Sequence, residues 1–543
     1  MKRKAVAAVL TAVMVASMFT GCGSDKGSSS AKSTSAASAA NDTVDEDGKV
    51  NGIMYQEGLP LVDEGAYTFS IFCDDSSESG EFIMLDEFKK QTNVDVDLKI
   101  YPYETATERL NLDLNSGDYA DVIGGWTLSD NAILTYGVNQ GVFIPLEDYF
   151  EKYCPNISAI LDLPGVREKM TAPDGHIYTI PYVCADSTVG YSPYINTKWL
   201  ENVGMSMPTT TEEFEAVLKA FKEQDANGNG DASDEIPFST DPNNKHIEAM
   251  AGYFGLPMNK LGIAIQNEKV VYGGVSNTYR EFLSWFHKLY ADGLVDVELY
   301  TQDSSTWEGK GNQDLYGVSI AYGSGEFTGI PAAEERGDFD SMPVLNTDKD
   351  GIWLRDTEGF SVYRTQAVIT NKAEHPEIIC RWFDNAFALE NGIGCNRGPV
   401  GVIVNKEDDG YHAIDTTTLS EEDQEKYSWG NLWPQSLPKY LPADFEFVEE
   451  HPMYDEKKAT EEAYEANLTK EIIPSYWIDL DKIDTFSDTN TAIKDFFEQQ
   501  QAQFVCGELD IDNDADWQAY VDGMYSLGLE DWVATQGIEE IAK

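Results

Sequence analysis

The first part of the chain alternates strand and helix patterns in an order that restricts the fold to a largely parallel sheet. Residues 67–72 alternate apolar and polar side chains, and residues 81–92 carry apolar side chains at helical spacing. A second strand is predicted over residues 94–100, a second helix over 105–114 and a third strand over 120–123. Strands joined through helices lie parallel, with the helices on the faces of the sheet. We therefore predict an α/β fold.

Ligands of such sheets collect at the carboxyl ends of the strands. Here the first strand runs into the polar loop 73–80, and the third runs into the turn Gly124-Gly125-Trp126. We expect a ligand site beside this loop and this turn. The chain has 543 residues, which is more than one hydrophobic core supports, so we expect two lobes.

A second α/β region begins near residue 190. Thr210 and Glu213 form a capping box ahead of a helix with one apolar face. Strands are predicted over residues 315–321, directly before Tyr322, and over residues 366–370.

The N-terminus carries the pattern of a lipoprotein signal. Residues 1–4 are mostly basic, residues 5–19 are nearly all apolar, and small residues precede Cys22. This resembles a bacterial lipobox, in which Cys22 would be diacylated and would become the mature N-terminus; an ordinary secretory signal with a chance cysteine is the alternative. We expect a signal peptide over 1–21 and a flexible tether over 22–66, because its first part is rich in Gly, Ser, Ala and Thr.

Charge and cysteine content exclude some classes of protein. The formal charge is −57, from 38 Lys and Arg against 95 Asp and Glu, so we expect no nucleic-acid partner, because phosphate binding needs a cationic face. A neutral or cationic ligand fits this charge. The seven cysteines include no Cys-x-x-Cys pair and indicate mainly buried free thiols, with one or two bridges left open.

An Asp/Asn-rich segment over residues 225–235 has the spacing of a calcium loop. Calcium takes about six to eight oxygen ligands, and Gly230 at position six permits the sharp turn that such a loop needs. Ile236 stands at position twelve, where an EF-hand has Glu, so the strict EF-hand pattern is absent; a metal-free turn is the alternative. The predicted calcium ligands are Asp225, Asn227, Asn229, Asp231, Asp234 and Glu235.

The stretch of residues 191–238 that contains this loop resembles the extracellular solute-binding proteins (family 1) of carbohydrate ABC importers. The matching residues, in order, are Asn196, Trp199, Leu200, Pro208, Thr209, Glu213, Phe214 and residues 225–237. Residues 171–182 and 516–533 resemble other parts of that family. One departure is a gap between Gly230 and Asp234 that is one residue longer than usual.

The resemblance implies a two-lobed periplasmic-binding-protein-like fold (type II) with lobes joined by a hinge. We expect the first lobe over 67–185, the second over 186–365, and a return crossing and helical region over 366–543 that completes both. It further implies a lipid-anchored, monomeric, non-enzymatic protein on the extracellular face of the cell membrane. Its partners would be an oligosaccharide and the permease subunits of an ABC transporter, with structural calcium.

Sugar sites need aromatic side chains for C–H faces and polar groups for hydroxyls. Trp126 and Tyr322 each follow a predicted strand and are the best candidates for the walls of the cleft. Trp199, Trp285 and Trp382 lie in apolar helical patterns and are expected in the core. The predicted ligand-binding residues are Trp126, Tyr322, Asp74, Asp75, Glu78, Trp353 and Trp433.

Two other classes of function remain open from the sequence. A sugar-sensing receptor without transport would have the same sequence features. A secreted glycoside-acting enzyme would need a carboxylate pair, which spacing alone does not reveal, and the chain has no Gly-x-Ser-x-Gly, His-Glu-x-x-His or phosphate-loop motif.

The lipobox predicts a specific effect of removing one thiol. We expect Cys22→Ala protein to be released into the medium or to stay unprocessed, because lipidation and cleavage both need the cysteine. Cell fractionation and the mass of the mature N-terminus measure this. A variant that is processed and anchored like the parent contradicts the prediction.

Overall fold

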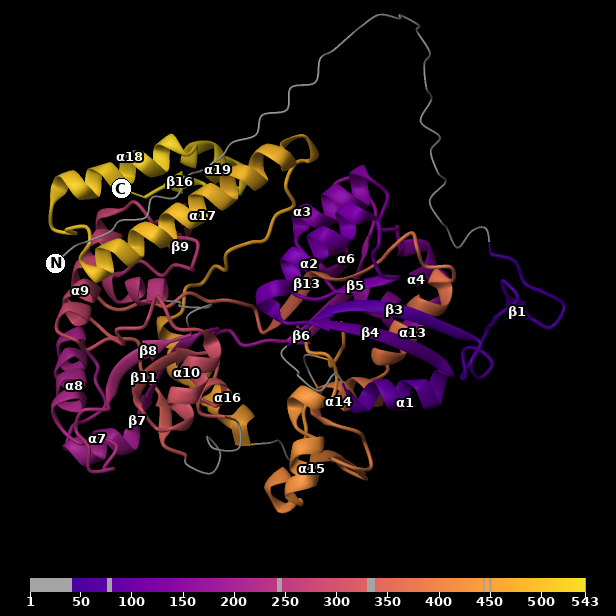
Figure 1. Cartoon of the computed structure of the whole chain (residues 1–543), viewed down its shortest axis with the longest axis horizontal. Helices are drawn as coiled ribbons and strands as arrows, with labels where there is room; N and C mark the ends of the chain where they lie inside the picture. The colour runs from indigo at the N-terminus through magenta and orange to yellow at the C-terminus, as the bar shows by residue number, and fades with distance from the viewer. Residues whose placement is uncertain are drawn as a thin grey trace, which may run out of the picture. The chain divides into compact units, whose positions relative to one another are not determined.

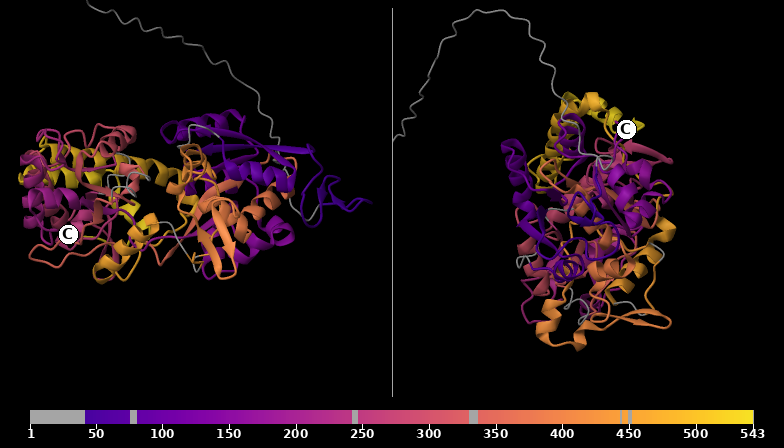
Figure 2. Two further views of the ribbon diagram at one scale, coloured as in Figure 1. Left: turned by 90° about the horizontal axis from the view of Figure 1, so that it is seen from below. Right: turned by 90° about the vertical axis from the view of Figure 1, so that its right-hand side faces the viewer.

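The computed structural model describes residues 42–75, 81–241, 247–329, 337–442, 445–448 and 452–542. The described residues fall within one compact unit. Within that unit two α/β lobes each have their own sheet, as Figures 1 and 2 show. The predicted two-lobed α/β class is confirmed.

The first lobe is built on a five-stranded sheet in the order β4-β3-β5-β13-β6. β3 pairs in parallel with β4 and β5, whereas β13 pairs antiparallel with β5 and β6 (Figure 1). The strand bounds are β3 (Tyr67–Asp74), β4 (Val94–Tyr101), β5 (Val122–Gly124), β6 (Thr179–Ala185) and β13 (Phe360–Ile369). The three parallel strands predicted from periodicity are thus confirmed.

Alternate side chains of β3 are buried in two different cores, one on each face of this sheet. Phe69 and Ile71 point into one core, and Phe72 points into the other. The first core includes Trp382 of α13, whose ring meets Phe69 edge-on at 5.3 Å between centroids. The helices of this lobe are α1 (Ile83–Thr92), α2 (Tyr103–Ser116), α3 (Asp130–Ala132), α4 (Glu147–Tyr153), α5 (Pro155–Leu161), α6 (Val166–Met170), α13 (Pro376–Ala386), α14 (Leu389–Arg397) and α15 (Glu421–Lys426).

The second lobe is built on a four-stranded sheet in the order β12-β7-β11-β8. Its strands are β7 (Ser192–Asn196), β8 (Ile236–Thr240), β11 (Tyr316–Ala321) and β12 (Phe339–Ser341). The predicted capped helix is α8 (Thr211–Glu223), and the Thr210 hydroxyl accepts from the N–H of Glu213 at 3.2 Å. Other helices are α7 (Thr197–Val203), α9 (Asn277–Ala291), α10 (Ser304–Asn312), α11 (Gly325–Thr328) and α16 (Pro452–Tyr464).

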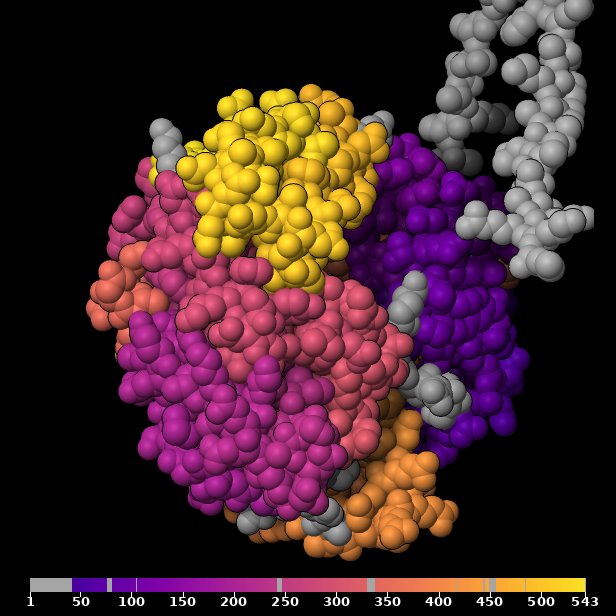
Figure 3. Space-filling view, turned by 60° about the vertical axis from the view of Figure 1, so that its left-hand side comes forward, coloured from indigo at the N-terminus to yellow at the C-terminus, as the bar shows by residue number. Residues whose placement is uncertain are grey.

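The C-terminal helices complete the second lobe. Phe497 of α17 stacks on Tyr279 of α9, with ring centroids 5.5 Å apart. In Figure 3 this yellow and gold region covers the α9 side of the lobe. The elements here are α17 (Ile483–Cys506), α18 (Asp514–Ser526) and α19 (Leu529–Thr535), with β16 (Glu540–Ile541) paired to β10 (Lys269–Tyr272), which also pairs with β9 (Ile263–Gln266).

Two predicted boundaries differ from the structure. From residue 42 the expected tether is ordered: β1 (Lys49–Val50) pairs with β2 (Met54–Tyr55), and Val50 and Met54 are buried in the first core. The strand expected from residue 366 begins at Phe360. The prediction missed its first half because polar side chains interrupt the apolar pattern there. The expected lobe boundary at residue 365 therefore falls inside a strand of the first sheet.

The expected loop-rich stretch contains the hairpin β14 (Val404–Glu407) and β15 (Gly410–Ala413). The six described cysteines are free thiols. None of the helices in the described ranges is both long and apolar enough to cross a membrane.

Candidate functional site

The turn after β5 is held by the carboxylate of Asp74, at the end of the neighbouring strand β3. Its Oδ1 accepts from the N–H of Trp126 at 3.0 Å, and its Oδ2 accepts from the N–H of Thr127 at 2.6 Å. Gly125 between them has φ of +135°, and a Cβ there would lie 2.4 Å from the Asp74 carboxylate. The turn leaves the Trp126 side chain 46% exposed.

Asp74 and Asp75 therefore hold backbone instead of facing a ligand. Both residues are buried, and Asp75 Oδ2 accepts from the N–H of Gln435 at 2.8 Å. Burial raises the pKa of the Asp74 carboxyl group, opposed by its hydrogen bonds. The expectation that these side chains meet ligand hydroxyls is not supported by their positions, and Glu78 lies outside the described residues.

Trp126 belongs to a cluster of three aromatic rings at the carboxyl edge of the first sheet. Its indole meets Tyr363 of β13 edge-on, with ring centroids 5.3 Å apart. Tyr363 stacks on Tyr182 of β6 at 5.4 Å. We call Trp126, Tyr182 and Tyr363 the ring cluster.

One carboxylate links the ring cluster to the second lobe. Asp186 follows β6, and its Oδ2 accepts from the Tyr363 hydroxyl at 3.0 Å while its Oδ1 accepts from the Tyr322 hydroxyl at 3.0 Å. Tyr322 follows β11 of the second sheet and is 36% exposed, and Tyr191 meets it edge-on at 6.1 Å. The structure thus brings Trp126 and Tyr322 to one site, where Asp186 joins them through Tyr363.

The other two predicted tryptophans lie in the cores. Trp433 stacks on Trp382 at 5.7 Å, and Trp353 packs against Tyr253 and Tyr464. Trp433 and Trp353 are at most 1% exposed, so the structure offers neither ring to a ligand. Both tryptophans lie in polar loop segments of the sequence, which suggested that they are exposed. Packing against residues distant in the sequence buries them instead. Trp199 and Trp382 are buried as expected, and Trp285 is half-buried.

The predicted calcium loop folds back on itself through its own side chains. Asp225 Oδ2 accepts from the N–H of Gly230 at 2.9 Å, and Gly230 has φ of +97°. The amides of Asn227 and Asn229 donate to the two carboxylate oxygens of Asp234, at 3.3 and 2.8 Å. Four of the six predicted ligands, Asp225, Asn227, Asn229 and Asp234, therefore take part in the hydrogen bonds that close this loop.

Two buried carboxylate oxygens in this loop lack a donor. Asp225 Oδ1 and Glu235 Oε2 have no hydrogen-bond partner in the described structure, while the other Glu235 oxygen accepts from the N–H of Ala226 at 2.9 Å. Burial raises the pKa of Glu235. Buried carboxylate oxygens without donors are costly unless a cation satisfies them, so this donor set fits calcium. Asp231 instead accepts from Ser233.

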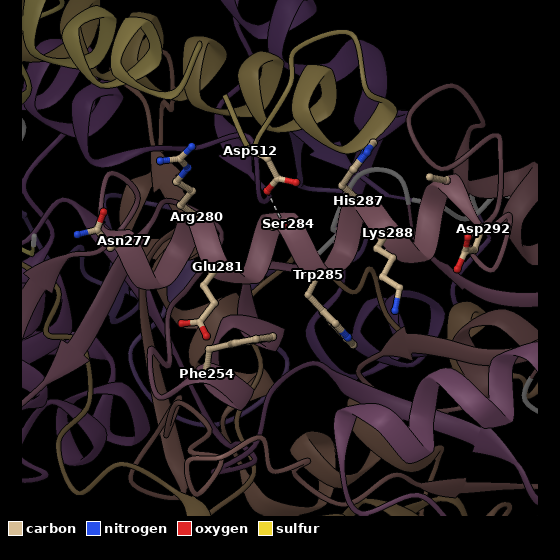
Figure 4. Close-up of a pocket in the computed structure, with 11 residues that line it drawn as sticks. Phe254, Asn277, Arg280, Glu281, Ser284, Trp285, His287, Lys288, Asp292 and Asp512 are labelled. Carbon is tan, nitrogen blue, oxygen red and sulfur yellow. Dashed lines mark hydrogen bonds between the residues drawn. The ribbon is translucent and has the colours of Figure 1, made fainter. Parts of the chain in front are cut away.

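A surface hollow of about 830 Å³ along α9 lies elsewhere (Figure 4). In Figure 4 Arg280 and His287 leave one side of the helix, while Glu281 and Lys288 leave the other. The charged ends are also paired, as in the contact of Lys288 with Glu215 at 2.8 Å. Side chains that diverge and are already paired do not converge on a ligand.

Comparison with known proteins decides the family. The model of the family described as "Bacterial extracellular solute-binding protein" matches residues 76–392. The chain belongs to this family. That assignment agrees with the two α/β lobes.

One member of known role is similar to this solute-binding protein in both sequence and structure. The fructooligosaccharide ABC transporter substrate-binding protein FusA of Streptococcus pneumoniae is 31% identical over 379 residues, which cover 67% of this chain and 68% of FusA. The structure of FusA in complex with kestose is 26% identical, with a TM-score of 0.76, covering 86% of this chain and 98% of that one. An EF-hand mutant of FusA has a TM-score of 0.74 at 26% identity, with coverage of 86% and 98%.

The sequence reasoning missed Tyr182, Tyr191, Tyr363 and Asp186. Asp186 follows β6, which is the kind of position that singled out Trp126 and Tyr322, whereas Tyr182 lies inside that strand. Tyr363 lies in the half of β13 that the apolar pattern did not reveal. The link through Asp186 required knowledge of the tertiary fold.

The position of Asp74 predicts the effect of one isosteric change. In Asp74→Asn the amide group faces the N–H of Trp126 or Thr127, so one buried donor loses its acceptor, at a cost of about 1–3 kcal/mol. We expect a lower unfolding midpoint in thermal denaturation. Asp86→Asn on the exposed side of α1 is the control and should match the parent; equal midpoints for all three proteins contradict the anchoring role.

Proposed function

We propose that this solute-binding protein captures a neutral oligosaccharide of the fructooligosaccharide type and delivers it to the permease of an ABC importer. The observation that carries the proposal is the joining of two exposed aromatic residues, Trp126 and Tyr322, at one site between strand ends of the two sheets. The similarity to FusA supports the ligand class.

The chemistry of the site suits a sugar. Exposed rings offer apolar faces for sugar C–H groups, and their desolvation on stacking supplies affinity. Asp186 and the tyrosine hydroxyls offer acceptors and donors beside those rings. A ligand that touches both Trp126 and Tyr322 contacts both lobes, which is how such receptors couple binding to closure.

The charges around the site favour a neutral ligand. Asp186, Glu326 and Asp356 surround Lys457, whose ammonium group already donates to two backbone carbonyls. An anionic sugar would meet these carboxylates, and the ammonium group of Lys457 beside them is already engaged by the two carbonyls.

We propose binding without turnover. The carboxylate at the centre of the site, Asp186, accepts hydrogen bonds on both oxygens from tyrosine hydroxyls, which is a structural use. A sensor without transport would bind the same sugar. Loss of growth on that sugar after deletion of this protein favours import, and persistent growth favours sensing.

Anchoring and assembly belong to the same proposal. We propose that Cys22, which lies outside the described residues, carries the lipid that holds the protein on the extracellular face of the cell membrane. The receptor acts as a monomer, because each copy contains a complete site with aromatic residues from both lobes.

We also propose that calcium binds the loop after α8. Asp225 and Glu235 supply the buried oxygens that lack a donor, and Asn227, Asn229 and Asp234 supply further oxygens of the kind that calcium prefers. The ion would tie α8 to β8 and stabilise the second lobe. The EF-hand named in the mutant of FusA supports this assignment.

The sugar proposal predicts that each ring is needed. We expect kestose binding in titration calorimetry, and we expect Trp126→Ala and Tyr322→Ala each to weaken it by about 2 kcal/mol or more, because buried aromatic contacts are the usual anchors. Tyr525→Ala, on the exposed face of α18, is the matched control and should bind like the parent. Parent-like affinity in both cleft variants removes these rings from the site, and release of hexose from kestose contradicts a binding-only role.

The calcium proposal predicts linkage between metal and stability. Calcium bound only to the native state raises the unfolding midpoint, so chelator should lower the midpoint of the parent. Asp225→Ala should have a low midpoint that chelator leaves unchanged, whereas the exposed control Asp118→Ala should respond like the parent. Calcium-free protein whose midpoint does not rise on addition of calcium chloride excludes the site.

A further inference from the structure

Lys457 of α16 reaches the turn that carries Tyr322. Its Nζ lies 2.6 Å from the carbonyl oxygen of Gly190 and 2.7 Å from that of Tyr322. The same Nζ lies 3.9 Å from the centroid of the Tyr322 ring. One ammonium group therefore connects α16, the residue before Tyr191 and the end of β11.

Two carboxylates accept hydrogen bonds from the N–H groups of the same two residues, Gly190 and Tyr322. Glu326 accepts from the N–H of Tyr322 at 2.9 Å, and Asp356 accepts from the N–H of Gly190 at 2.6 Å. The backbone of Tyr322 is thus held on both sides, its hydroxyl group binds Asp186, and Lys457 lies over its ring. A Cβ at Gly190 would lie 2.2 Å from the Asp356 carboxylate, so this contact also excludes a side chain there.

We propose that Lys457 is the positioning residue for Tyr322, and that its charged form holds the Tyr322 ring in the orientation that stacks on the sugar. This inference rests on the proposed function. A ring that is already fixed loses little conformational freedom when a ligand arrives, so pre-organisation contributes directly to affinity. A cation over an aromatic face adds a further attraction that depends on the proton.

The surroundings of Lys457 make its charge dependent on pH. Burial lowers the pKa of Lys457 to about 8, although the neighbouring carboxylates oppose this shift. The acidic groups that face it are Glu326 of α11, Asp356 before β13, Glu456 and Glu461 of α16, and Asp186 after β6. The lysine is charged below this pKa and neutral above it, so the contribution of Lys457 to affinity should be present on the acid side and lost on the alkaline side.

Titration calorimetry with kestose tests the inference, over a range from about pH 6.5 to about pH 9.5 around the lysine pKa. The parent should bind about tenfold more weakly at the alkaline end, which is about 1.4 kcal/mol. Lys457→Met should bind weakly at every pH. Lys457→Arg should restore most of the affinity and bind equally at both ends, because a guanidinium group stays charged throughout. Lys458→Met, one residue along the same helix, is the matched control and should follow the parent.

The outcomes separate this inference from the proposed function. A parent that binds kestose equally at both ends of the range, or a Lys457→Met protein with parent-like affinity, overturns the positioning role and leaves the sugar-binding role intact. A parent that binds neither kestose nor any other oligosaccharide overturns both. Should Lys457→Met fail to fold, the pH profiles of the parent and of Lys457→Arg decide the matter.

Discussion

The first sheet depends on a strand that arrives late in the chain. β13 lies between β5 and β6, and it pairs antiparallel with both. β5 leads to Trp126, β6 carries Tyr182, and β13 carries Tyr363, so the ring cluster forms only when β13 is in place. The bond between Tyr363 and Asp186 joins residues 177 positions apart. The geometry of the ring cluster therefore depends on strand pairing between distant parts of the chain.

Local patterns predicted those parts of the fold that local physics determines. The alternation in β3 and β4 reflects the two faces that each strand presents, and the apolar face of α8 reflects burial against a core; these three elements were predicted correctly. β13 was found only in its second half, because Ser361, Arg364 and other polar residues interrupt the apolar pattern of its first half. The ordered segment from residue 42 was missed since its few apolar residues are buried only by the distant first core.

The positions of Trp126 and Tyr322 after strands were predicted correctly, because position along a strand was sufficient information. Trp126 and Tyr322 follow strands, and such residues reach the carboxyl edge of a sheet in any α/β fold. Trp353 and Trp433 stand among polar neighbours, yet tertiary packing covers both. The role of Asp74 required knowing that the turn at residue 126 lies beside it, because the same carboxylate in open solvent would be free to bind a hydroxyl group.

At this site acidic side chains hold the backbone, whereas the Trp126 ring remains exposed. Asp74 accepts from the turn at Trp126, and Gly125 allows the close approach that this needs. The side chain of Trp126 plays no part in those bonds. The ring at position 126 can therefore be exchanged for another side chain, or for a reporter fluorophore, while the Asp74–Gly125 contact keeps the new group at the same point in space.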